Sequence, residues 1–368
     1  ESKKNRLIAE ARTLRALYYF NLVRFFGDVP LILDLKTVED SKGPRDSKEL
    51  IYDQIIEDLT FAEEHLPLRS EYSASDEGRI NKGAAKILFG KVYLTKGDFQ
   101  KAKDKLAEVV EHESEYGFGL HKDYHANWLR DTEAGIEAVL YIEYKEPPFQ
   151  HNGEMALAGP KYSIPGSLGI SALNEADIPT QELYDQFDNR DLRKKTNFKT
   201  EFAHLKTGEI LKSSIPLSGK FWVEGLETGD RCDVNMHIIR YADAILMYAE
   251  ALNEVGKSTK ALAMLNRIRE RAFGDDSGNF KPMSKDEFRT AILNERRLEF
   301  PHEGHRWFDL VRTGTFIQRM KEHSAYEAKV AEANKTEIAQ NIKEHMILMP
   351  IPQSEIDLNP NLVQNAGY

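Results

Sequence analysis

The stretch ERRLEFPHEGHRWFDL, residues 295–310, gathers acidic, basic and histidine side chains of the types used in acid–base chemistry. General acid–base catalysis needs two carboxyl groups placed across a substrate, in environments that push their pKa values apart. Here the acids alternate with arginines at helical spacings, which holds carboxylates ionised in ion pairs. The stretch therefore favours a structural salt-bridge network over a catalytic site. Its members are Arg296, Arg297, Glu299, Glu303, Arg306 and Asp309, around Trp307 and Phe308.

Two histidines in the same stretch raise the question of a metal site. His302 and His305 bracket Glu303 in the order HEGH. In the zinc motif H-E-x-x-H the second histidine lies one residue further along, so the spacing here falls short. The single cysteine, Cys232, permits neither an internal disulfide nor a multi-cysteine metal site. We expect no metal and no cofactor, although Asp and Asn side chains in the loop-rich region are compatible with calcium.

Aromatic side chains outside the helical pattern point to a different chemistry, the binding of sugars. Sugar rings present C–H faces that stack on flat aromatic rings, and their hydroxyl groups pair with amides, carboxylates and guanidinium groups. Such side chains belong on loops held by a rigid scaffold. The aromatic candidates are Trp128, Tyr162, Trp222 and Tyr72, and the polar candidates at the rim are Asn127, Asn152 and Arg130. Each of these four aromatics is also compatible with a place in the core. Trp307 is the opposite case, because its arginine-rich helical setting favours a core role.

Composition and charge exclude several classes of function. The 368 residues are 41% hydrophobic and 30% charged, which is typical of a globular protein with a sizeable core. A net charge of -10 argues against nucleic acid as the main partner, because phosphate binding needs an excess of Lys and Arg on one face. No run approaches the roughly 18 apolar residues of a membrane span. Nucleophile elbows, phosphate loops and dinucleotide fingerprints are absent from the sequence. The opening ESKKNRL lacks a signal-like apolar core, so the chain is either cytosolic or without its targeting segment.

Hydrophobic periodicity divides the chain into a helical part, an insert and a second helical part. Glycine and proline recur in the insert, which has a strand-like run and one helix. The tail is expected to be a short apolar strand followed by a turn-rich extended segment. The expected helices are roughly 3–26, 47–65, 80–96, 98–114 and 180–187, the strand-like run is 138–144, helical periodicity resumes over 237–320, and 321–343 is a surface helix or a mobile arm.

The first helix carries more aromatic side chains than one buried face needs. Residues 9–33 read AEARTLRALYYFNLVRFFGDVPLIL, with five aromatics within nine positions. Some of these rings must therefore pack against a second layer of helices or line a groove.

Two segments repeat one pattern in the same register. Each has a small residue in its first helix, a glycine in the turn and a small residue in its second helix, which is tetratricopeptide spacing. The segments are KILFGKVYLTKGDFQKAKDKLAEVV, with Gly90, Gly97 and Ala102, and AILMYAEALNEVGKSTKALAMLNRIRE, with Ala249, Gly256 and Ala261. One such pair cannot bury its own apolar face, so further helix pairs must stack beside it.

Five stretches, met in order along the chain, resemble the signatures of the SusD/RagB family. They are AEARTLRALYYFNLVRFFGDVPLI, GRINKGAAKILFGKVYL, IIRYADAILMYAEALNEVG, ILNERRLEFPHEGHRWFDLVRTG and LMPIPQSEIDLNPNLVQNAGY. The resemblance runs from about residue 6 to the last residue and is weakest in the insert. It implies a mostly α fold, a tetratricopeptide-like superhelix of helix pairs with a loop-rich insert containing a few short strands.

The resemblance also implies a division of the chain. We expect residues 1–368 to form a single SusD-like body. Within it, we expect first helix pairs over 1–115, a variable insert with the candidate ligand site over 116–236, later helix pairs over 237–320, and a surface helix and extended tail over 321–368.

Members of this family are surface-exposed outer-membrane lipoproteins of Bacteroidetes that bind glycans and sit as a lid on a SusC-like, TonB-dependent transporter. The resemblance implies the same role here: non-catalytic binding of an oligosaccharide or polysaccharide and its delivery to such a transporter during polysaccharide utilisation. The family's lipidated cysteine and first segment have no counterpart in this sequence. We therefore expect contact with the membrane through a lipid anchor absent from this fragment. The insert is the part that varies most among family members, so the family motifs do not assign any ligand-binding residue in this sequence.

Two other functions remain open. A tetratricopeptide-type module that holds a peptide or protein would show matching side chains on successive first helices, but Lys91 and Glu250, beside Gly90 and Ala249, differ in charge. A glycoside hydrolase would release new reducing ends from oligosaccharides, and we expect none.

Overall fold

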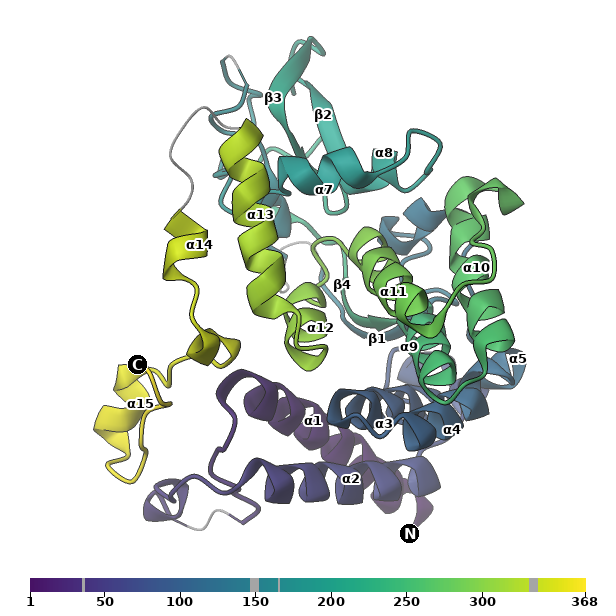
Figure 1. Cartoon of the computed structure of the whole chain (residues 1–368), viewed down its shortest axis with the longest axis vertical. Helices are drawn as coiled ribbons and strands as arrows, with labels where there is room; N and C mark the ends of the chain where they lie inside the picture. Colours follow the sequence, from purple (N-terminus) through teal and green to yellow (C-terminus); the bar gives the residue numbers. More distant parts are fainter. Residues whose placement is uncertain (35–36, 146–151, 165, 331–336) are drawn as a thin grey trace. The chain divides into compact units, whose positions relative to one another are not determined.

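The computed structural model describes residues 1–34, 37–145, 152–164, 166–330 and 337–368 (Figure 1). Contacts between Cα atoms group the chain into two compact units. One unit comprises Glu1–Gly97 and Trp307–Tyr368, and the other comprises Asp98–Arg306. The expected single body and its subdivision at residues 115, 236 and 320 stay predictions. Within the described ranges, no helix has both the length and the apolar character needed to cross a membrane.

The unit formed by residues 1–97 and 307–368 is built around three long helices. Helix α1 (Ser2–Phe26) packs along α2 (Lys48–His65), and α2 packs on α3 (Lys82–Lys96). The C-terminal part of the chain adds α12 (Arg306–Arg312), α13 (Phe316–Val330), α14 (Glu337–Asn341) and α15 (Gln353–Leu358), and short 3-10 helices lie at Glu39–Ser41, Arg69–Glu71, Ala74–Asp76 and Glu344–Ile347. Helix α13 follows the expectation of a helix after residue 320, and residues 331–336 of that segment lie outside the described residues.

Polar side chains cap the N-terminal ends of α2 and α3. The side chains of Ser47 and Asn81 accept hydrogen bonds from backbone N–H groups in the first turns of α2 and α3. Each cap satisfies a donor that has no partner inside its own helix, so these residues fix where the helices begin.

The unit formed by Asp98–Arg306 is centred on α9 (Tyr241–Glu254), whose residues are buried from Tyr241 to Asn253. Helix α9 packs against α4 (Phe99–Val110), α10 (Ser258–Phe273) and α11 (Lys285–Glu299). Shorter helices complete the unit: α5 (Glu113–Tyr116), α6 (Glu154–Ala158), α7 (Gln181–Gln186) and α8 (Lys194–Asn197), with 3-10 helices at Tyr124–Trp128, Gly229–Arg231 and Asp276–Gly278.

The turns of the two sequence repeats share one backbone conformation. Gly97 and Gly256 both have φ near +78°, the left-handed region that glycine adopts without steric cost. Ala102 and Ala261, the small residues of the second helices, are fully buried. Helices α9 and α10 pack together as the second repeat predicts. The fold is therefore mostly α, with tetratricopeptide-like helix pairs, as the sequence predicts.

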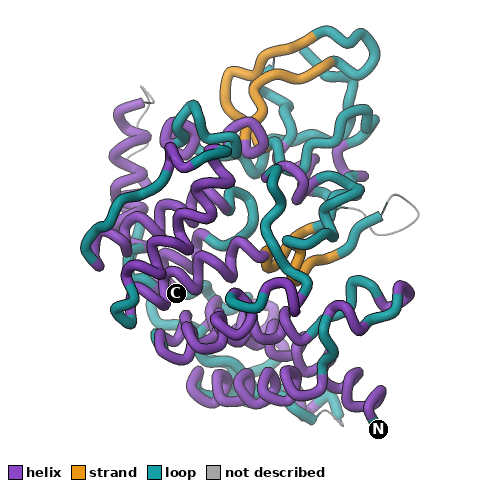
Figure 2. The backbone as a smooth tube through the Cα atoms, turned by 90° about the vertical axis from the view of Figure 1, so that its right-hand side faces the viewer, coloured by secondary structure: helices purple, strands orange, loops and turns teal. Residues whose placement is uncertain are grey.

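Strands occur in two small antiparallel sheets, drawn in orange in Figure 2. Strand β1 (Ala138–Ile142) pairs with β4 (Met236–Arg240), and β2 (Phe198–Ala203) pairs with β3 (Ile210–Ser218). The prediction of a few short strands within the loop-rich insert, including the run at 138–144, is thus confirmed.

Two local predictions are wrong. Residues from His237 were expected to be helical, but Met236–Arg240 form β4 because their backbone pairs with β1, and the helix begins at Tyr241. The tail was expected to open with an apolar strand, but its backbone has other partners. The N–H of Met349 donates to the carbonyl of Phe25 at the end of α1, and the N–H of Ile351 donates to the side chain of Gln364.

The aromatic rings of α1 point in several directions, which accounts for their number. Phe20 is fully buried, and Phe25 packs on Phe308 with ring centroids 4.9 Å apart. The hydroxyl of Tyr19 bonds to the loop that follows the helix. Tyr18, by contrast, is 64% exposed. The expected second layer thus explains some of these rings, and Tyr18 is left on the surface.

Candidate functional site

The arginine–glutamate stretch forms a buried ion-pair network in the unit of residues 98–306. The carboxylate of Glu299 lies 2.5 Å from a guanidinium nitrogen of Arg271, 2.9 Å from one of Arg193 and 3.0 Å from one of Arg240. Glu303 pairs with Lys220 at 2.6 Å and with Arg240 at 2.7 Å. All of these side chains are removed from solvent. The prediction of structural ion pairs is confirmed for Glu299 and Glu303, but their cationic partners all lie outside the predicted stretch. Arg296 and Arg297 of the stretch pair instead with Asp243 and Glu182.

The charges of this network keep its carboxylates ionised, which stabilises the interior but does not provide a proton donor. Burial alone would raise the pKa of Glu299, but the guanidinium groups of Arg271, Arg240 and Arg193 outweigh it and lower the pKa to about 2. Arg240 and Lys220 likewise hold the pKa of Glu303 well below its ordinary value against the effect of burial. Both carboxylates are therefore ionised at neutral pH, and neither has the raised pKa of a general acid.

The two histidines of HEGH diverge. Nδ1 of His302 lies 3.4 Å from a carboxylate oxygen of Asp177, whereas Nδ1 of His305 lies 3.8 Å from one of Asp243. Across the described ranges, no three His, Cys, Asp or Glu side chains are grouped so as to hold a metal ion. The histidines thus serve separate local contacts.

Trp128 and Asn127, two of the predicted ligand-binding residues, are buried. Trp128 is 4% exposed and packs edge-on against Tyr124, with Nζ of Lys220 4.5 Å from its ring centroid. Asn127 is fully buried and donates to the carbonyl of Tyr124. A ring enclosed in this way offers no face for stacking a sugar. The prediction for these two residues is therefore corrected: Trp128 belongs to an apolar cluster inside the insert, and Asn127 is held by internal hydrogen bonds beside it.

Asn152 also belongs to the interior. Its backbone N–H donates to the carbonyl of Cys232, its side-chain amide donates to the carbonyl of Val234, and its side-chain oxygen accepts from Glu154 N–H at the start of α6. Because these internal bonds engage both its amide nitrogen and its oxygen, we also remove Asn152 from the candidate site.

Trp222 is half-buried and joins two apolar clusters of the insert. It packs beside the cluster that contains Trp128 and beside a second cluster that contains Ile164 and Phe202. Its ring meets that of Phe202 edge-on at 4.7 Å. Trp222 therefore links the two clusters by packing, and little of its ring is open to a ligand.

Tyr162 is the predicted aromatic residue whose ring is most exposed. Its side chain is 75% exposed, whereas Ile164, two residues later, is buried in the cluster that Trp222 contacts. Nζ of Lys161 lies 5.1 Å from the Tyr162 ring centroid. A flat aromatic ring in solvent, beside an anchored neighbour, is the arrangement that sugar stacking requires.

The loop that carries Tyr162 is held by a single carboxylate. Oε1 of Glu175 accepts hydrogen bonds from the backbone N–H groups of Lys161, Tyr162 and Ser163 at 2.7–3.0 Å and from the Ser163 hydroxyl at 2.5 Å. Burial alone would raise the pKa of Glu175, but these donors lower it. Sequence reasoning missed Glu175, because nothing in its local pattern indicates a partner twelve residues away.

Strand β3 places hydroxyl groups beside this loop. The Ser213 hydroxyl donates to that of Ser163 at 2.8 Å, and the N–H of Ser214 donates to the carbonyl of Ser163 at 2.9 Å. Lys212 and Ser214 are exposed on the same strand. The candidate site thus combines one exposed ring with hydroxyl and ammonium groups from two anchored segments, and we define it by Tyr162, Ser163, Lys212, Ser213 and Ser214.

The remaining two predicted residues lie elsewhere. Arg130 is exposed and paired with Asp233 at 2.7 Å. Tyr72 is half-buried in the other unit, where its hydroxyl donates to the carbonyl of Ile80 at 2.7 Å. Its pKa is raised, first by burial and then by the carboxylate of Glu10. Both residues are engaged in these other contacts and lie outside the candidate site.

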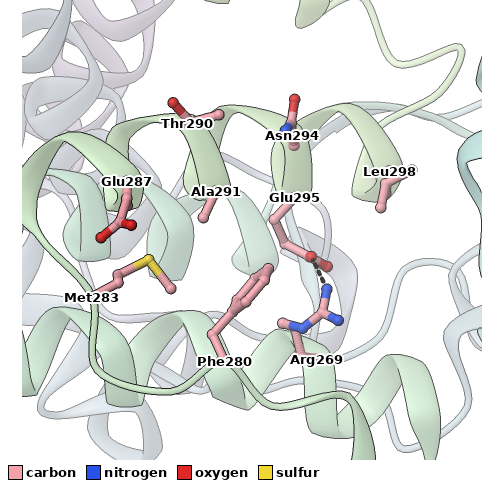
Figure 3. A pocket seen from close by; sticks show the side chains of 9 residues that line it. All are labelled: Arg269, Phe280, Met283, Glu287, Thr290, Ala291, Asn294, Glu295 and Leu298. Atoms are coloured by element: carbon pink, nitrogen blue, oxygen red, sulfur yellow. Dashed lines mark hydrogen bonds and ion pairs between the residues drawn. The ribbon is translucent and has the colours of Figure 1, made fainter.

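A separate candidate is a cavity of about 440 Å³ between α10 and α11 (Figure 3). Phe280 and Met283 form its apolar side, and Thr290 and Asn294 lie on one face of α11. The Arg269 guanidinium carbon is 4.1 Å from the Phe280 ring centroid, and its Nη1 pairs with Glu295 at 2.7 Å. Because this arginine covers one face of the ring, the cavity offers a poorer stacking surface than Tyr162.

The geometry also bears on a peptide-binding groove. Such a groove would need an open face on successive first helices, but α9 is buried from Tyr241 to Asn253, including Glu250. The face that the second repeat would present is therefore already filled by its neighbours.

Comparisons with known proteins agree on one family. Residues 213–368 match the family model described as the SusD family, and residues 1–94 match the one described as starch-binding associating with outer membrane. SusD-like protein P2 of Formosa agariphila is 31% identical over 407 residues, which cover 100% of this chain and 75% of that protein. Starch-binding protein SusD of Bacteroides thetaiotaomicron is 31% identical over 98% of this chain and 72% of its own length. A solved laminarin-binding SusD-like protein superimposes with a TM-score of 0.77 at 28% identity, covering 100% of this chain and 80% of that one.

Proposed function

The chain belongs to the SusD family, and from that premise we propose that it binds a glycan at the outer-membrane surface without cleaving it. The ligand is an oligosaccharide or polysaccharide that stacks on Tyr162. The bound glycan then passes to a SusC-like, TonB-dependent transporter, and a lipid anchor holds the protein at the membrane.

The observation that carries this proposal is the exposed ring of Tyr162 on a loop fastened by Glu175. When the C–H face of a sugar covers an exposed aromatic ring, apolar surface of both groups is removed from water, and this favours binding. Because the loop is already ordered by Glu175 and β3, little conformational entropy is lost on binding. The exposed hydroxyl of Ser214 is the nearby partner for sugar hydroxyls, whereas the hydroxyls of Ser163 and Ser213 donate to Glu175 and to Ser163 and serve mainly to order the loop.

Absence of catalysis is part of the proposal. Glycoside hydrolysis needs two carboxyl groups facing one sugar, with one of them protonated at working pH. The carboxylates of the family signature, Glu299 and Glu303, are instead buried and ion-paired. The carboxylate that holds the Tyr162 loop, Glu175, has its pKa lowered and accepts from four donors.

The relatives suggest which glycans to try first. Two of them are described as binding starch and laminarin, which are both glucose polymers. Native gels cast with starch, laminarin and a panel of other plant, host and microbial polysaccharides test the proposal. Retarded migration in one glycan class, with no new reducing ends after incubation, is the expected result. Release of reducing ends would reject the non-catalytic part, and unretarded migration in every gel would reject glycan binding by this chain.

A further inference from the structure

Three backbone positions with unusual conformation all involve one segment of the insert. Within the described residues, the non-glycine residues with positive φ are Ala172 (+59°), Glu175 (+55°) and His302 (+58°). Ala172 and Glu175 belong to the segment of residues 171–177, and His302 contacts that segment through Asp177. Residues with a Cβ atom are disfavoured in this left-handed region, and those held there cluster at functional sites. The strain therefore directs attention to what the segment holds in place.

Hydrogen bonds to α6 fix the backbone of this segment. The N–H groups of Asn174, Ala176 and Asp177 donate to carbonyls of α6 at 2.8–3.0 Å. The N–H of Glu175 donates to the carbonyl of the residue that follows α6, at 3.1 Å. Because its backbone is fixed, Glu175 can direct its carboxylate at the loop that carries Tyr162.

His302 joins this segment to the stretch of residues 295–310. Its side chain is 7% exposed, and its Nδ1 lies 3.4 Å from a carboxylate oxygen of Asp177. The next residue in the chain, Glu303, is held in the buried ion-pair network by Arg240 at 2.7 Å. The interior therefore sets the position of His302, and the imidazole in turn restrains Asp177.

Two carboxylates interact with His302 and determine the sign of its effect. The imidazole lowers the pKa of Asp177, so this carboxylate stays ionised over the pH range in which histidines titrate. Glu154, in the first turn of α6, has its pKa raised by burial and then by the charge of Asp177. A protonated His302 attracts both carboxylates, whereas a neutral imidazole leaves them to repel each other. The contact is therefore strongest on the acidic side of neutrality and weakens as the pH rises.

From these contacts we infer that His302 is a positioning residue of the candidate site. Through Asp177 it holds the segment whose Glu175 orders the Tyr162 loop, and glycan affinity is consequently higher when His302 is protonated than when it is neutral. The effect on affinity rests on the proposed function. Ordering of the loop does not require a glycan, so the two can be tested separately.

Hydrogen exchange of the full chain without glycan tests the positioning. The amides of Tyr162 and Ser163 donate to Glu175 and exchange only when the loop opens. His302→Asn removes the imidazole and keeps a residue that tolerates positive φ, and Asp177→Asn removes the charge of its partner. We expect either variant to exchange these amides about two- to fivefold faster than the wild type at pH 6, as for a partly exposed ion pair, with a smaller effect at pH 8.

A matched histidine variant and a titration complete the test. His112→Asn, at an exposed histidine between α4 and α5, is expected to leave exchange of the loop unchanged at both pH values. The double variant H302N/D177N should have no larger effect than either single variant, because both remove one contact. Calorimetry with the glycan that retards the protein should give an affinity about two- to fivefold higher at pH 6 than at pH 8 for the wild type, and nearly equal affinities for His302→Asn.

The outcomes separate this inference from the proposed function. Wild-type loop exchange in both His302→Asn and Asp177→Asn at pH 6, or effects as large at pH 8 as at pH 6, overturns the inference. If His302→Asn does not fold, Asp177→Asn decides alone, since its side chain is 59% exposed. Faster exchange at pH 6 with unchanged glycan affinity supports positioning by His302 and contradicts stacking of the glycan on Tyr162.

Discussion

At the scale of single residues, the same side-chain types serve opposite purposes in different surroundings. Glu299 is enclosed by three arginines and stabilises the interior, whereas Glu175 lies near the surface and orders a loop. The alternation of acids and arginines in the sequence predicted that Glu299 is ion-paired, but not its partners, which come from residues 193, 240 and 271. The second depends on a contact between Glu175 and a loop twelve residues earlier, which no local pattern encodes.

Removing the charge of Glu299 is expected to destabilise the protein strongly. The variant Glu299→Gln removes the buried carboxylate that Arg193, Arg240 and Arg271 share. These arginines keep other carboxylate partners, but breaking a buried ion pair typically costs about 3–5 kcal/mol of unfolding free energy. Urea denaturation measures this loss. The control Glu201→Gln removes one partner of an exposed pair with Lys212 and is expected to change stability by less than about 0.5 kcal/mol. Equal effects of the two variants would contradict the structural role of the network.

Glu299 also predicts how stability depends on pH. Its pKa in the folded protein is about 2, below the ordinary value of 4.5, so the folded state favours the ionised form. The resulting stabilisation is complete above about pH 4.5 and is lost as the pH falls toward 2. Thermal unfolding midpoints measured from pH 7 to pH 3 should therefore decline more steeply below pH 4.5 for the wild type than for Glu299→Gln. Parallel curves would show that this carboxyl group does not carry the effect.

At the scale of elements, periodicity predicted helices well and long-range pairing poorly. The helix pair around Gly256 and the caps at Ser47 and Asn81 follow from local signals. Strand β4 was mistaken for helix because its partner, β1, lies about a hundred residues earlier in the sequence. Burial of Trp128 was likewise unpredictable, since a tryptophan on an irregular segment is compatible with both core and surface.

The repeat turn gives a backbone prediction. Gly256 has φ near +78°, and no atom lies within 4 Å of the position that a Cβ would occupy. Gly256→Ala is therefore expected to cost about 1–2 kcal/mol through backbone strain alone. Gly43→Ala, at a glycine with equal space and without positive φ, is the matched control and is expected to be close to neutral. Chemical denaturation of both variants measures the difference, and equal stabilities would argue against the shared turn.

The anchoring of the Tyr162 loop predicts a graded effect on ligand binding. Glu175→Ala removes the acceptor of four hydrogen bonds and is expected to lower glycan affinity several-fold, because the ring must then be ordered on binding. Glu175→Gln retains an acceptor oxygen and should lose less. Calorimetric titration with the glycan identified on the gels gives the ranking. If the alanine variant binds as tightly as the wild type, Glu175 does not preorganise the site.

At the scale of the whole molecule, the ordered signatures decided the family, and the candidate site required the structure. Relatives and solved structures match across the length of the chain, and helix pairs account for most of it. Of the seven side chains selected as binding candidates, Tyr162 is both highly exposed and anchored, while Trp128, Asn127 and Asn152 are interior. Residue type and loop position were insufficient to separate these cases because exposure is set by packing between distant segments.

The central claim is that a glycan binds to this chain on the ring of Tyr162 and is not cleaved. Isothermal titration of the glycan that retards the protein, with wild type, Tyr162→Ala and the exposed control Tyr18→Ala, tests it most directly. We predict that Tyr162→Ala loses at least about tenfold in affinity, equivalent to about 1.4 kcal/mol, while Tyr18→Ala binds as the wild type does. Wild-type affinity in Tyr162→Ala, or an equal loss in Tyr18→Ala, would contradict the account.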